Sequence, residues 1–100
     1  MNNKINFTNL LNSNGGSKIQ YPVTFEIKAI MDNEIPEGDS RANLLKLFQQ
    51  LKISNTEWRS RLSGKGKYIS ISVLITIENQ PILKDLYSKL RDVPGMKMAI

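Results

Sequence analysis

Apolar and polar residues alternate in four stretches of the chain, and this period of two is typical of half-buried β-strands. The predicted strands cover residues 21–29, 57–62, 67–77 and 96–100. The second and third are joined by the short glycine turn Ser63–Gly66, which predicts a β-hairpin. The third carries branched aliphatic residues at every second position from Ile69 to Ile77, so we expect it in the centre of a sheet.

Two further stretches repeat apolar residues every three or four positions, as helices with one buried side do. The first stripe consists of Leu44, Leu47, Phe48 and Leu51. The Asp, Asn, Pro and Gly content of Asp32–Gly38 predicts a loop before this helix. We expect Asp39 or Ser40 to cap the helix, and we expect it to end near Ile53.

The second helix is predicted to begin at Asn79 and Pro81 and to stop at Pro94–Gly95. Its buried stripe consists of Ile82, Leu83, Leu86, Leu90 and Val93. The element order is therefore βαββαβ, and two right-handed βαβ halves then share one antiparallel sheet. We predict an α+β, ferredoxin-like sandwich with strand order 4-1-3-2, two helices on one face and an open second face.

The first 20 residues differ in composition from the rest, because they hold six asparagines and the Ser13–Ser17 run with two glycines. Such a polar segment buries little surface, so it predicts a flexible N-terminal tail before a domain over residues 21–100. Phe7, Leu10 and Leu11 have the spacing of one short apolar turn. The tail has no signal-peptide pattern and the chain has no long apolar run, so we expect a cytoplasmic protein outside the membrane.

The chain contains no histidine and no cysteine. The commonest general base, thiolate nucleophiles and thiolate metal sites are thereby excluded, so we predict no catalytic residues, no cofactor and no metal. Asp32, Glu34, Glu37 and Asp39 are clustered, but their spacing matches no calcium loop. That acidic loop also lacks an arginine, so it does not favour phosphate chemistry. We expect a protein that is not an enzyme.

Fourteen basic and nine acidic residues give a net charge of +5, which favours anionic partners. Basic residues gather on the predicted hairpin, and no acid lies between Trp58 and Ile77. The candidate ligand-binding residues are Arg59, Arg61, Lys65, Lys67, Tyr68 and Ser70. One platform on the open face consists of Arg59, Arg61, Tyr68 and Ser70 together with Thr24, Glu26, Lys28 and Ser72. An alternative interpretation is that the basic hairpin only balances the acidic loop. Sheets that bind RNA stack bases on aromatic side chains, and this platform offers one such side chain, Tyr68.

Three stretches together resemble the YbeD-like bacterial proteins, an uncharacterised family. They are Tyr21–Lys28, the hairpin Ser63–Val73 and the segment from Leu86 to Val93. The resemblance covers residues 21–100 and implies a ferredoxin-like fold similar to the ACT-like regulatory domains. It implies a regulatory or interaction role and brings no catalytic residues. The ACT-like ligand site uses a glycine after the first strand, where this chain has Gly38.

The sequence leaves two candidate functions. The first is a non-enzymatic regulatory or protein-interaction module, with a protein partner or a second copy held at an edge strand or at the open sheet face. The alternative is binding of nucleic acid or another anionic ligand through the basic hairpin and the open face.

Overall fold

The computed structural model describes residues 19–100. The apolar turn and residues 1–18 of the predicted tail lie outside that range, so those two statements stay predictions. The helices and strands are, in chain order, β1 (Val23–Asp32), α2 (Glu37–Gln50), β2 (Ser54–Leu62), β3 (Tyr68–Ile77), α3 (Gln80–Leu90) and β4 (Met96–Ala99). Within the described range, neither helix has the length and apolar character needed to cross a membrane.

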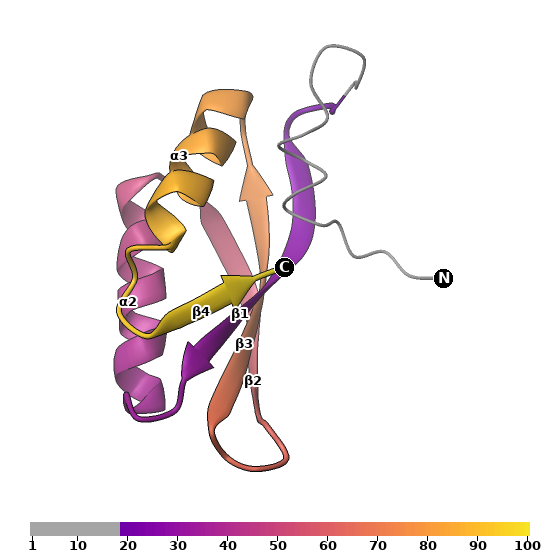
Figure 1. Ribbon diagram of the computed structural model, residues 1–100. Coiled ribbons are helices and arrows are strands. Elements are labelled where there is room, and N and C mark those ends of the chain that lie inside the picture. Colours follow the sequence, from indigo (N-terminus) through magenta and orange to yellow (C-terminus); the bar gives the residue numbers. More distant parts are fainter. Residues whose placement is uncertain (1–18) are drawn as a thin grey trace.

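The four strands form one antiparallel sheet in the order β2-β3-β1-β4. Figure 1 shows α2 and α3 side by side against one face of this sheet. The predicted ferredoxin-like fold and its strand order are therefore confirmed. Of the described residues, no helix or strand covers the opposite face, which is the predicted open face of the sheet.

The core lies between the sheet and the two helices. The central strands β1 and β3 send every second side chain into it, from Phe25 to Met31 and from Ile69 to Ile77. Phe48 of α2 and Leu86 of α3 are completely buried against them. Truncating such side chains to alanine costs about 3–5 kcal/mol, so these positions report on folding rather than on binding.

The start of α2 differs from the prediction. The helix begins at Glu37 after Pro36, and no side chain caps it, whereas Asp39 and Ser40 lie inside its first turn. The Pro36 carbonyl accepts hydrogen bonds from the amides of both residues, at 2.9 and 3.1 Å. Proline is suited to this place because its fixed φ suits a helix start. Asp39 still interacts favourably with the helix dipole, while Ser40 is buried.

The second helix begins as predicted. The Asn79 side-chain oxygen accepts a hydrogen bond from the Ile82 amide at 3.1 Å, and Pro81 lies in the first turn. The hairpin is also confirmed, because the amide of Ser63 donates to the Tyr68 carbonyl at 2.8 Å. The sequence signals were sufficient at both places because a cap and a tight turn depend on neighbouring residues alone.

A β-bulge interrupts β2 between Thr56 and Arg59, and it explains why the predicted strand began too late. The strand starts at Ser54, but Glu57 adopts a φ of 54° and its alternation changes phase there. Two residues therefore oppose one residue of β3. As a result, Trp58 packs half-buried against Phe48 with the ring centroids 5.8 Å apart, and Arg59 points to the open face.

A second bulge lies in β4 and corrects the prediction that Met96, Met98 and Ile100 continue one alternating face. Met96 pairs with the buried Met31, whereas Met98 pairs with Ile30 of the next register position, so Lys97 is the extra residue. Met96 therefore packs toward the core. Met98 is turned to the open face, where 56% of its surface is exposed.

Candidate functional site

Two rows of side chains cross the open face from β4 to β2. The first row follows directly from the strand registers: Met98 lies opposite Ile30, Ile30 opposite Ser70, and Ser70 opposite Arg61. Side chains of directly opposed residues point to the same face of a sheet. The row therefore changes from apolar at β4, through a hydroxyl on β3, to a guanidinium on β2.

The second row lies two residues further along β1 and β3 and differs at β1, where the cation Lys28 stands in place of Ile30. Ile100 exchanges backbone hydrogen bonds with Lys28 at 2.8 and 2.9 Å, Lys28 lies opposite Ser72, and Ser72 opposite Arg59. Three strand spacings separate the ends of each row, or about 14 Å. The open face is thus apolar at β4 and at Ile100 directly after it, and cationic along β2. Between these ends lie Ile30 and Lys28 of β1 and Ser70 and Ser72 of β3.

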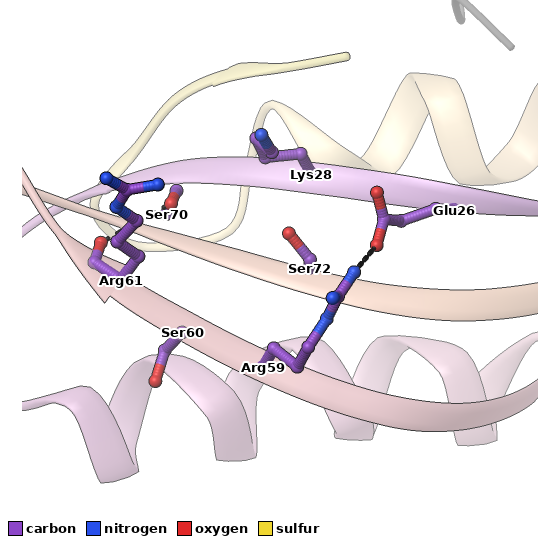
Figure 2. Close-up of a pocket in the computed structure, with 7 residues that line it drawn as sticks. All are labelled: Glu26, Lys28, Arg59, Ser60, Arg61, Ser70 and Ser72. Atoms are coloured by element: carbon purple, nitrogen blue, oxygen red, sulfur yellow. Dashed lines mark hydrogen bonds and ion pairs between the residues drawn. The ribbon is translucent and has the colours of Figure 1, made fainter. Parts of the chain in front are cut away.

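The charges on the open face are only partly balanced. Arg59 forms an ion pair with Glu26 of β1, and Figure 2 shows the two side chains reaching toward one another across β3. The Arg59 side chain nevertheless remains 72% exposed. Among residues 19–100, the Arg61 side chain has no acidic partner, and Lys28 adds a further positive charge. An anionic group therefore finds an available arginine here.

Two adjoining hollows lie on this face, both open to solvent. The first has a volume of about 320 Å³ and lies over the polar half, between Glu26, Lys28 and the arginines of β2. The second measures about 430 Å³ and includes Ile30, Leu62 and Tyr68. Lys28, Arg61 and Ser70 line both hollows, so one bound group can contact the two at once.

The predicted binding residues are only partly brought together. Arg59, Arg61 and Ser70 line the first hollow, and Tyr68 joins Arg61 and Ser70 at the second. Lys67 lies at the end of the sheet, with its Nζ 6.0 Å from the Tyr68 ring centroid. Lys65 is exposed in the hairpin turn.

The acidic loop and the basic hairpin do meet, but not through an ion pair. Asn33 bridges them: its amide donates to the Lys67 carbonyl at 3.1 Å, and its side chain donates to the Gly66 carbonyl at 2.9 Å. Within residues 19–100, the hairpin and β2 cations form no salt bridge with the loop, whose Asp32 instead pairs with Lys97 at 4.0 Å. Charge balance by this loop therefore does not account for the arginines of β2.

The apolar half of the face was missed by the sequence reasoning. The predicted platform lacked Ile30, because the predicted first strand ended at residue 29. It lacked Met98 and Ile100, because both were assigned to the face of Met96. In the described part of the chain, no three His, Cys, Asp or Glu residues gather as a metal site. The face therefore provides a binding surface, with cations at one side and apolar groups at the other.

The comparisons with known proteins agree with the family suggested by the sequence. The family described as "Protein of unknown function (DUF493)" matches residues 16–100. The chain belongs to this family. A UPF0250 protein of Shewanella amazonensis is 23% identical over 91 residues, which cover 91% of this chain and 100% of that protein. A UPF0250 protein of Buchnera aphidicola is 27% identical over 82% of this chain and 91% of its own.

Two solved structures share the fold of this DUF493 domain. Protein HP0495 from H. pylori has a TM-score of 0.66 at 16% identity and covers 87% of this chain and 90% of its own. The C-terminal domain of the MgtC protein from Mycobacterium tuberculosis has a TM-score of 0.62 at 15% identity, with coverage of 83% and 89%. At such identities these likenesses establish the ferredoxin-like fold. The resemblance to an uncharacterised bacterial family is confirmed.

Proposed function

We propose that this domain is a non-enzymatic regulatory module that binds an acidic segment of a partner protein on the open face of its sheet. The observation that carries the proposal is the pair of cross-strand rows that end at Arg59 and Arg61, on the face that no helix or strand of residues 19–100 covers. A sheet normally buries both faces or keeps one polar. Here exposed arginines and exposed apolar side chains share the uncovered face, and this mixture is typical of an interface.

A protein segment fits the shape of the face better than a small molecule does. Small-molecule sites are concave and bury most of their ligand, whereas both hollows here are shallow and lie side by side on a sheet. Nucleic-acid binding is less well supported because Tyr68 is the one aromatic residue among those that line the two hollows. Sheets that bind RNA stack two or three bases on aromatics of the central strands.

The edge strands are weaker candidates than the open face. Bulges interrupt both β2 and β4, and exposed Arg59 and Lys97 lie beside them. Bulges and edge cations are the devices by which proteins prevent strand addition. Pairing of two copies face to face is also disfavoured, because both would present the same arginines. The open face therefore remains the best candidate surface, and an acidic segment remains the best candidate partner.

Site-specific photo-crosslinking tests this function. Tyr68 at the open face and Leu45 on α2 are both 37% exposed, so they form a matched pair of positions for a photoreactive benzoylphenylalanine. In an extract of the source organism, we expect a protein adduct from position 68 and none from position 45. Adding Arg61→Glu should abolish that adduct. Equal adducts from both positions, or an adduct that survives Arg61→Glu, would contradict the proposal.

A further inference from the structure

We infer that the partner segment is an amphipathic helix that lies along the strands, with its apolar flank over β4 and its carboxylates over β2. This inference rests on the proposed function and goes beyond it by assigning the chemistry and orientation of the bound segment. The two cross-strand rows carry the inference, because each runs from an apolar side chain to an arginine in the same direction.

The β4 side of the face is unusually apolar for a surface exposed to water. Met98 is 56% and Ile100 39% exposed, and Ile30 lies beside Met98. Exposed apolar groups that lie together mark interaction sites more often than single ones do. The Lys97 bulge is what turns Met98 onto this face, since regular alternation would place it with Met96 on the core side. The bulge therefore protects the edge and also supplies the apolar flank.

The β2 side supplies the charge. Arg61 has no acidic partner among residues 19–100, and Arg59 keeps most of its side-chain surface exposed while it pairs with Glu26. Arginine holds carboxylates in a planar fork, which gives direction as well as attraction. A carboxylate-bearing flank over these residues would meet two guanidinium groups from adjacent rows.

One helix is wide enough to reach both ends of each row. The rows extend over about 14 Å, and a helix with its side chains is about 10–12 Å wide. A helix laid along the strands therefore touches both ends of each row with opposite flanks. The opposite face of this same sheet is covered by helices, so helix-on-sheet packing is already the rule in this fold.

Charge distinguishes this occupant from two other candidates. The segment 1–18 of the same chain contains Lys4 and Lys18 and no Asp or Glu, so it does not complement the arginines. A second copy presents the same cations and would be repelled. An acidic helix of another protein complements both halves of the face.

Designed peptides test the chemistry of the segment on the full chain. The probe is a peptide of about 18 residues, long enough for about five helical turns, with leucines on one flank and glutamates on the other. One control peptide replaces the glutamates by lysine, and a second replaces the leucines by serine. Two-dimensional NMR of the labelled protein measures affinity and location together. We expect the acidic amphipathic peptide to bind about tenfold more tightly than either control, with shifts along both rows.

Substitutions on the protein test the orientation. Arg61→Gln should weaken the acidic peptide about fivefold at low salt, and the effect should shrink as salt rises. Met98→Ser should weaken binding of the acidic peptide about fivefold at every salt concentration, because the substitution removes apolar contact. Lys46→Gln and Leu45→Ser, exposed positions on α2, serve as matched controls and should change nothing.

Several results would overturn the inference. Equal binding of the acidic and lysine peptides, shifts confined to α2 and α3, or an unchanged affinity in Met98→Ser would each do so. Tighter binding of a single-stranded oligonucleotide or of a synthetic 1–18 peptide on the same rows would assign the face to that occupant instead. If the crosslink at position 68 depends on Arg61 but the protein binds all three peptides equally, the proposed function is supported and the inferred helix with its orientation is wrong. If the crosslink also fails, both fall.

Discussion

Replacing Gly95 by alanine tests how β4 is attached to the rest of the sheet. Gly95 has a φ of +82°, a backbone conformation that residues with a side chain rarely adopt. Its carbonyl accepts a hydrogen bond from the Asp32 amide at 2.8 Å, directly before β4 begins. The turn therefore sets where Met98 and Ile100 lie on the open face.

Two separate effects contribute to the expected loss of stability. The positive φ costs an alanine about 1–2 kcal/mol. A Cβ at this position would also lie 2.6 Å from the Ile35 Cδ1, closer than van der Waals contact allows. Because Cδ1 is the end of a side chain, it can move at a cost of about 1 kcal/mol. We expect Gly95→Ala to lower the free energy of unfolding by about 2–3 kcal/mol, a large share of the ~5–15 kcal/mol typical of a domain.

Urea unfolding measures this change, and two further variants separate its causes. Gly38, in the first turn of α2, has open space around it, so Gly38→Ala should stabilise the protein by about 0.5–1 kcal/mol. Ile35→Val removes the clashing Cδ1 atom. In that background Gly95→Ala should cost only the backbone part, about 1–2 kcal/mol.

A Gly95→Ala variant as stable as the wild type would contradict both expected costs. Destabilisation of Gly38→Ala by as much would contradict them as well. If the loss were the same in the presence and absence of Ile35→Val, the contact with Ile35 would carry none of the cost.

Three further predictions can be measured by the same unfolding experiments. Asn79→Ala removes the cap of α3 and should cost about 1 kcal/mol. Glu57→Gly relieves the positive φ in the β2 bulge and should stabilise by up to about 1 kcal/mol, whereas Glu57→Val should destabilise. Burial raises the pKa of Tyr21, so the unfolded chain loses this proton first. The contribution of Tyr21 to stability should then be complete below pH ~10 and be lost as the pH rises from there toward the folded-state pKa, and Tyr21→Phe should lack that part of the fall.

The element order and the sheet topology could be predicted from the residue pattern alone. Alternation in the central strands and the apolar helix stripes extend over many residues, so single exceptions do not obscure them. Local signals were equally reliable at Asn79 and at the Ser63–Gly66 hairpin turn, where both hydrogen-bonding partners are near neighbours. The arginines of β2 were also assigned to the open face from alternation alone.

The rest of the site depends on how the strands pair in three dimensions. Whether a strand contains a bulge depends on its partner, because the extra residue is defined by what it fails to pair with. At Lys97 that single extra residue separates Met96 in the core from Met98 on the open face, and at Glu57 it directs Trp58 beneath α2. Register then aligned four strands so that apolar and cationic ends face opposite edges. Such an alignment is a relation between distant segments, and no short stretch of sequence contains it.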